Sequence, residues 1–210
     1  ALVKQIQADS IAAVEAAQRM SSDTASVAQV AAAPVSIYKD SLLEAAHSAE
    51  AQIVTLANDK FEVAFTTKGA QPYSVKINEY SSYGGGELFI FKPEMSRYDI
   101  QVYAGETINT ADFNFVVAEK TDTSLAMRLP FAGGGYIEQR YSIAEGSYSV
   151  KNYLSFVGME NVIPKNVFSF DVDYFVTMPR MEKGYKSEVQ YSKLDYYFNG
   201  EKKPEAIAKG

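Results

Sequence analysis

The sequence predicts a mainly β protein whose strands form an antiparallel sandwich or barrel. From Ile53 onward, short runs with apolar residues at alternate positions follow one another, as expected for half-buried strands. Turns containing glycine or proline separate these runs, and no helical pattern lies between them. Of the phenylalanines and tyrosines, 12 and 15 in number, only Tyr38 lies before Gln52. The core therefore belongs to the later three-quarters of the chain.

The chain begins with an alanine-rich leader. Residues 1–51 contain 15 alanines and no glycine, which favours helix near the start until Pro34. A second helix is predicted over Asp40–Ala51, with Asp40 or Ser41 as its cap. Because the apolar stripe is thin, residues 1–52 are interpreted as a partly helical, partly disordered linker. The alternative is a coiled-coil partner helix, but no sustained heptad supports it.

A β-hairpin opens the sheet-forming part of the chain. Phe61, Val63 and Phe65 share one face of a predicted strand, and the alternation resumes at Tyr73 after the turn Thr67–Ala70. Further strands are predicted at Leu88–Phe91, Ile100–Tyr103, Asp112–Val117, Ser124–Leu129, Tyr136–Ile143, Tyr148–Phe156, Val167–Thr177 and Glu188–Phe198. The longest of these exceed the usual five or six residues, which favours a large, extended sandwich.

Composition excludes several classes of function. The chain has no cysteine, so disulfides and thiolate chemistry are ruled out, and its net charge of −6 without a basic cluster argues against nucleic-acid binding. The only histidine, His47, lies in the leader and is interpreted as a solvent-exposed linker residue. The sequence therefore predicts no catalytic triad in the β region, no metal site that needs two histidines, and no cofactor.

Membrane and export signals are absent from the sequence as well. No apolar run approaches the roughly 18 residues of a spanning helix, and no signal peptide is recognisable. The first residue is Ala1 instead of Met, which indicates a processed or truncated protein.

Three motifs could carry chemistry, and each also has a structural explanation. Asp171 and Asp173 share one strand face and could bind a hard cation, but alternating acids usually form the solvated face of a strand. Gly84–Gly86 and Gly133–Gly135 lack the following helix and lysine of a phosphate loop, so they are interpreted as turns.

The third motif is a tyrosine-rich segment near the end of the chain. It contains Tyr185, Tyr191, Tyr196 and Tyr197, interspersed with lysines. Aromatic side chains with a polar rim suit a carbohydrate platform or a partner-binding edge. The alternative is that these tyrosines are half-buried strand positions, since tyrosine packs well in sheets.

Three stretches resemble the first large periplasmic domain of the YidC membrane-protein insertases, in particular Bacteroidetes-type members. They are VTLANDKFEVAFTTKGAQPYSVKINEY at Val54–Tyr80, GGGYIEQRYSIAEGSYSVKNYLSFVGMENVI at Gly133–Ile163 and SEVQYSKLDYYFNGEKK at Ser187–Lys203. Ala70 departs from the family pattern, which commonly has a second glycine in this turn. The family's insertase machinery, a membrane groove with a buried arginine, has no counterpart in this chain.

The resemblance implies a galactose-mutarotase-like β-supersandwich over residues 53–203, after the linker over 1–52 and before a tail at 204–210 that leads toward a membrane region. It implies a non-catalytic domain on the periplasmic side of the bacterial inner membrane. The expected partners are SecF-like Sec translocon components and nascent membrane proteins, with no small-molecule ligand. The alternative is a carbohydrate-binding or mutarotase-like sugar-processing domain. The lone His47 argues against the enzymatic form of that alternative, because mutarotase-like chemistry relies on several histidines.

Overall fold

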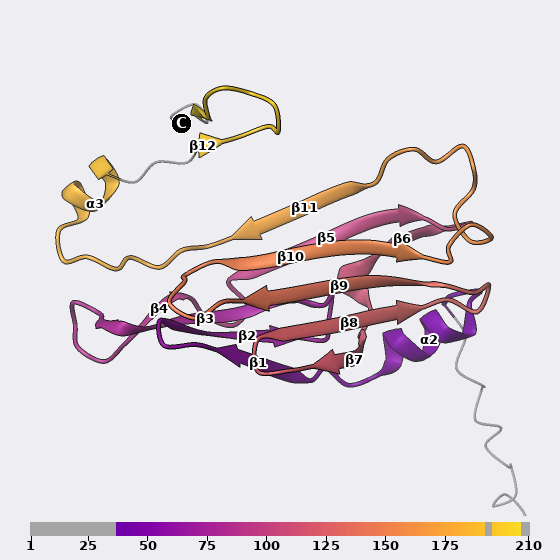
Figure 1. Ribbon diagram of the computed structural model, residues 1–210, viewed down its shortest axis with the longest axis horizontal. Coiled ribbons are helices and arrows are strands. Elements are labelled where there is room, and N and C mark those ends of the chain that lie inside the picture. Colours follow the sequence, from indigo (N-terminus) through magenta and orange to yellow (C-terminus); the bar gives the residue numbers. More distant parts are fainter. Residues whose placement is uncertain (1–36, 192–194, 207–210) are drawn as a thin grey trace, which may run out of the picture. The chain divides into compact units, whose positions relative to one another are not determined.

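The computed structural model describes residues 37–191 and 195–206 (Figure 1). The helix predicted before Pro34 lies outside these residues. Within the described part, residues in strands greatly outnumber residues in helices, which confirms the mainly β prediction. All the sheets in this part are antiparallel, which is consistent with a sandwich.

The elements follow one another along the chain, mostly with short connections, and a longer one, residues 158–170, precedes β11. In order they are α2 (Ser41–Ser48), β1 (Ile53–Ala57), β2 (Phe61–Thr66), β3 (Gln71–Ser81), β4 (Glu87–Phe91), β5 (Ser96–Tyr103), β6 (Thr107–Asn109), a 3-10 helix (Thr110–Asp112), β7 (Val116–Lys120), β8 (Ser124–Pro130), β9 (Tyr136–Ile143), β10 (Val150–Val157), β11 (Asp171–Val176), α3 (Tyr185–Tyr191), β12 (Asp195–Tyr196) and β13 (Glu205–Ala206).

The predicted opening hairpin is confirmed as the centre of the first sheet, whose strand order is β1-β2-β3-β4. Phe61, Val63 and Phe65 are at most 1% exposed, because alternate residues of β2 face the core. In the connecting turn, Gly69 and Ala70 have φ values of 72° and 47°. This left-handed backbone suits the glycine but strains the alanine, and Ala70 is nevertheless fully buried.

Two further sheets complete the core. β10-β9-β8-β7 form one and β11-β5-β6 form the other, while β12 and β13 pair separately. The rings of Phe65 in β2 and Tyr141 in β9 lie 4.4 Å apart, so the first two sheets pack face to face through aromatic side chains. A single buried cluster draws residues from α2 and from strands of all three larger sheets.

Helix α2 confirms the second predicted helix and its cap. The Asp40 carboxylate accepts hydrogen bonds from the Leu42 and Leu43 amides at 2.8 and 3.3 Å, as an N-cap residue should. Leu43 and Ala46 are buried in the common core. The helix is therefore held by packing, and this part of the leader is joined to the sheets.

Two strand predictions differ from the structure in the kind of element, and the predicted strand Val167–Thr177 forms only over Asp171–Val176. Asp112–Val117 begins as a 3-10 helix, and β7 starts only at Val116. Phe113 and Phe115 are both buried, and the Phe115 amide donates to the Thr67 carbonyl in the hairpin turn instead of to a strand partner.

The predicted strand Glu188–Phe198 is wrong over residues 188–191, where the structure has helix α3. Lysine, glutamate and glutamine in this segment favour helix, and Val189 alone does not establish a strand period. The Glu188 carboxylate accepts the Met181 amide at 2.8 Å, and the Glu188 amide donates to the Gly184 carbonyl. These bonds hold the start of the helix.

No helix among the described residues is long and apolar enough to cross a membrane.

Candidate functional site

A groove opens between the edges of two sheets, and we call it the β10–β11 groove. It has a volume of about 350 Å³ and is lined by Pro72, Tyr98, Tyr141, Val150, Asn152 and Tyr174. These residues come from β3, β5, β9, β10 and β11. Figure 1 shows β10 and β11 along the same side of the molecule, and each strand is at the end of its own sheet. The groove therefore lies where the sandwich is not closed.

The groove combines aromatic walls with a small polar floor. The ring centroids of Tyr98 and Tyr174 lie 6.0 Å apart in an edge arrangement. The Asn152 amide donates to Gln139 Oε1 at 2.8 Å. Gln139 is fully buried, and its Nε2 has no hydrogen-bond partner among the described residues. An unpaired buried donor is uncommon and marks a place where a partner would be stabilising.

Two tyrosines of the groove, Tyr141 and Tyr174, are poor acid–base groups. The Tyr141 hydroxyl donates to the Ala70 carbonyl at 2.7 Å, and burial raises the pKa of Tyr141 strongly. Burial also raises the pKa of Tyr174. Both side chains therefore stay neutral near pH 7, and the groove offers apolar contact and hydrogen bonding instead of proton transfer.

The predicted tyrosine surface is divided between two places. Tyr185 is 64% exposed and belongs to a cavity of about 390 Å³ beside α3, which we call the α3 cavity. Its lining is Met178, Pro179, Arg180, Met181, Tyr185, Glu188 and Val189. Tyr196 and Tyr197 lie at β12, where their hydroxyls donate to the Glu205 carboxylate and the Glu201 carbonyl. The side chain of Tyr191 lies outside the described part.

The α3 cavity has a charged anchor and a flexible apolar wall. Arg180 lies over the ring of Tyr83 at 5.4 Å and donates to its hydroxyl at 3.2 Å, which ties this segment to the loop between β3 and β4. Met178 is 63% exposed. Methionine adapts its shape to different partners, so the cavity suits apolar peptide contacts.

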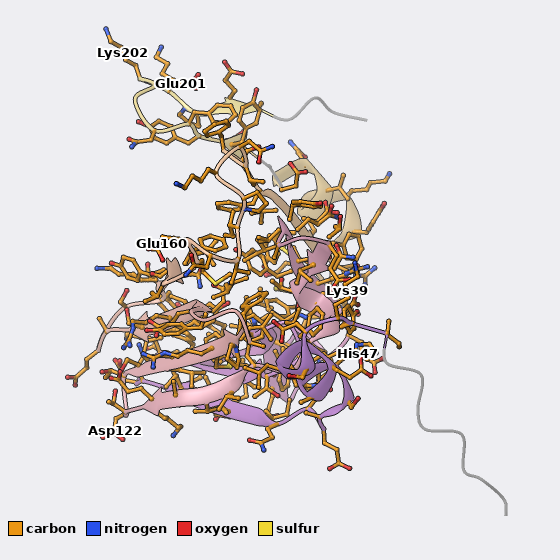
Figure 2. The ribbon with its side chains drawn as sticks, turned by 90° about the vertical axis from the view of Figure 1, so that its right-hand side faces the viewer. Lys39, His47, Asp122, Glu160, Glu201 and Lys202 are labelled. Carbon is orange, nitrogen blue, oxygen red and sulfur yellow. The ribbon has the colours of Figure 1, made fainter. Side chains whose placement is uncertain are left out.

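The expectation that His47 is a solvent-exposed linker residue is wrong. His47 projects from α2 (Figure 2), and its Nδ1 lies 3.1 Å from the Asp112 carbonyl. Its ring packs at 5.2 Å from Tyr38 and 6.0 Å from Phe113. Helix packing against the 3-10 segment explains the half-buried position. His47 therefore packs against a backbone carbonyl and two aromatic rings instead of standing free in a linker.

The charged clusters tie strands and loops together. Lys60 Nζ lies 2.5 Å from the Glu79 carboxylate, which also accepts the Tyr148 hydroxyl at 2.5 Å. The hydrogen bond to Glu79 raises the pKa of Tyr148 to about 12. Asp171 and Asp173 are exposed on β11. No group of three potential metal ligands occurs among the residues that the structure describes.

The β10–β11 groove was not predicted from the sequence, although one pattern of residues pointed to it. Gln139 stands in the apolar register of β9, between Ile137 and Tyr141. A polar residue on the apolar face of a clear strand predicts a special environment. Its location beside an open sandwich edge depends on strand pairings that are distant in sequence.

Comparison with curated proteins finds several membrane protein insertases named YidC. The chain is 27% identical to the insertase of Porphyromonas gingivalis over 94% of its own length and 34% of that protein. It is 27% identical to that of Phocaeicola vulgatus over 90% of the chain and 30% of the relative. It is 24% identical to that of Bacteroides fragilis over 77% and 26%.

The chain thus spans about one third of the length of the curated relatives it matches most extensively. No family model and no solved structure matches it. The relatives are Bacteroidetes proteins that share one name, and the matched segment covers nearly the whole chain. The resemblance drawn from the sequence is therefore confirmed: this chain is similar to one segment of the Bacteroidetes YidC membrane protein insertases.

Proposed function

We propose that this chain is a non-catalytic periplasmic domain of a YidC-type insertase. In this role it supports insertion and folding of inner-membrane proteins by contacting other proteins. The similarity to insertases over 94% of the chain is the observation that carries the proposal. Tyr141 and Tyr174 of the groove are neutral, and the described residues offer no cluster of metal ligands, which is compatible with a binding role.

The proposed organisation follows from this role. Residues 1–52 form the connection from the membrane, residues 53–203 the sandwich on the periplasmic side of the inner membrane, and residues 204–210 the beginning of the connection to the following part. Helix α2 stiffens the end of the first connection, because Leu43 and Ala46 anchor it in the core.

The proposed contact surface is the α3 cavity, together with the separate tyrosines Tyr196 and Tyr197 at β12. Tyr185 and Val189 are 64% and 54% exposed on one short helix, and Met178 lies beside them. Exposed aromatic and methionine side chains are typical of protein-binding surfaces. The proposed partners are SecF-like components of the Sec translocon and nascent membrane proteins.

A photo-crosslinking residue tests this surface in the full-length protein in its native membrane. Placed at Tyr185 or Tyr197, it should crosslink a Sec component or a newly made membrane protein. The matched control position is Tyr153, which is 56% exposed on the outer face of β10. Equal crosslinking at Tyr185 and Tyr153 would contradict the proposed surface.

Sugar titration tests the alternative of a carbohydrate-binding domain. If the proposed function is correct, isothermal titration of the chain with monosaccharides and oligosaccharides should give no saturable heat. Saturable binding below about 1 mM, an affinity of about 4 kcal/mol, would favour the carbohydrate function instead. A Tyr185→Ala variant that loses such binding would assign the sugar to the α3 cavity.

A further inference from the structure

The apolar face of β11 is the most unusual surface in the described part of the chain. The sequence predicts a long apolar face at Phe168–Val176, which would normally be buried. Among the described residues β11 pairs with β5 alone, and Phe170, Val172 and Tyr174 are 44%, 47% and 57% exposed. Within that part of the chain, the strand therefore leaves an apolar face only half covered and a row of backbone hydrogen-bonding groups without a strand partner.

This edge has only part of the usual protection against association. Natural sheet edges carry charged side chains, especially lysine, or a proline or a bulge. β7, the far edge of the neighbouring sheet, ends in Lys120 and has a shifted register between Val117 and Glu119. β11 has Asp171 and Asp173 but no lysine, proline or bulge, and it pairs in continuous register from Asp171 to Val176. A strand of this kind is expected to be covered permanently.

The β10–β11 groove provides space for the covering element. Its cavity of about 350 Å³ runs under Tyr174 and reaches Asn152 on β10, which is also an edge strand. Asn152 contacts Gln139, whose unpaired Nε2 lies close to the same region. The ring contact between Phe156 and Phe170, at 5.3 Å, is an existing bridge between the two edges. Additional apolar side chains would extend this bridge.

We propose that an extended β-strand pairs with the free edge of β11 and inserts its apolar side chains into the β10–β11 groove. Its source is the rest of the same polypeptide in the full-length protein. About two thirds of the matched relative from Porphyromonas gingivalis lies outside the segment that corresponds to this chain. A permanently covered, hydrophobic edge suits an intramolecular strand better than a transient partner, whose free state would expose the edge.

Charge distinguishes this strand from a second copy of the chain. If two β11 strands pair antiparallel about Val172, Asp171 of each copy lies opposite Asp173 of the other. If they pair about Asp173, the two Asp173 side chains lie opposite each other. Such like-charge pairs destabilise a sheet. The inferred strand therefore carries lysine or arginine facing these two carboxylates and apolar residues on the groove side.

Paired variants test the proposal by comparing the 210-residue chain with the full-length protein. Val172→Asp places a charge on the apolar face of β11. Val116→Asp is the matched control on the edge strand β7, where the valine is 60% exposed. In the 210-residue chain both variants should shift the thermal midpoint equally and slightly. In the full-length protein only Val172→Asp should lower the midpoint of the sandwich, by several degrees.

Amide hydrogen exchange supplies an independent measurement without mutation. The amides of β11 that face away from β5 should exchange at least about tenfold more slowly in the full-length protein than in the 210-residue chain. Equal exchange in both proteins would overturn the proposal. Protection that grows with the concentration of the 210-residue chain would assign the edge to a second copy. Protection of the full-length protein only in the presence of a separate polypeptide would assign it to a partner. Either result would also overturn the proposal.

Discussion

The hydrogen bond between Tyr141 and the hairpin turn should be one of the strongest single polar contributions to stability. The Tyr141 hydroxyl donates to the Ala70 carbonyl at 2.7 Å, with both residues buried. Tyr141→Phe keeps the ring contact with Phe65 but leaves the Ala70 carbonyl without this donor. An unsatisfied buried group costs about 1–3 kcal/mol, so the free energy of unfolding should fall by about 2 kcal/mol at pH 7. Urea unfolding would show this as a midpoint lower by about 1 M.

The same variant should behave differently in alkaline solution. Burial raises the pKa of Tyr141 above its ordinary value. Its contribution to stability is therefore complete below the unfolded-state pKa of about 10 and declines above it, because only the unfolded state then releases the proton. At one pH unit above the unfolded-state pKa, the ionisation of this tyrosine in the unfolded state lowers the free energy of unfolding by about 1.4 kcal/mol. The stability difference between the unsubstituted chain and the Tyr141→Phe variant should shrink from about 2 kcal/mol at pH 7 to less than about 1 kcal/mol at pH 11.

A matched substitution separates this effect from the general loss of a hydroxyl. Tyr153→Phe removes a hydroxyl from a side chain that is 56% exposed, and it should change the free energy of unfolding by less than about 0.5 kcal/mol at either pH. If Tyr141→Phe is as mild as Tyr153→Phe at pH 7, the Ala70 carbonyl does not depend on this donor. A stability difference that stays constant up to pH 11 would contradict the argument from burial.

Three further changes should alter unfolding measured with urea. Gly135→Ala places a Cβ 2.3 Å from the Gly158 carbonyl oxygen and should lower the free energy of unfolding by at least about 3 kcal/mol. Its control, Gly134→Ala, places the Cβ in open space at a φ of 98° and should lower the free energy of unfolding by about 1 kcal/mol. Asp40→Ala removes the acceptor of two helix α2 amides and of one loop amide, and should cost about 1–2 kcal/mol, part of which Asp40→Asn recovers. Although burial opposes it, hydrogen bonds from two arginines hold the pKa of Glu138 below its usual range. Glu138→Gln should therefore destabilise at pH 7, and the difference should disappear as the pH falls through the folded-state pKa; a loss independent of pH would exclude the ion pairs as its cause.

Alternation in the sequence was sufficient to predict the strands whose neighbours are close in the chain. β9 begins and ends at the predicted residues Tyr136 and Ile143. The hairpin of β2 and β3 also has the predicted turn, because period-two patterning and turn chemistry are both local. Asp40 caps its helix as expected for the same reason. These features follow from a few adjacent residues.

Features that depend on distant contacts could not be predicted. His47 becomes half-buried because α2 packs against the segment near Phe113, more than 60 residues later in sequence. The candidate tyrosines are divided between α3 and β12, because local helix preference around Glu188 outweighs the weak strand pattern. The sequence supplied aromatic residues suited to binding, but not their arrangement on one surface.

The β11 strand shows why an apolar pattern alone does not identify a core. Period-two alternation states that Val172 and Tyr174 share a face, but not whether another element covers that face. If an additional strand of the full-length protein fills the β10–β11 groove, this groove is not open to a translocon component or a nascent membrane protein. Partner contacts would then fall to the α3 cavity, where Tyr185 remains exposed. Crosslinking at Tyr185 and hydrogen exchange at β11 therefore report on separate surfaces, and the failure of one proposal leaves the other standing.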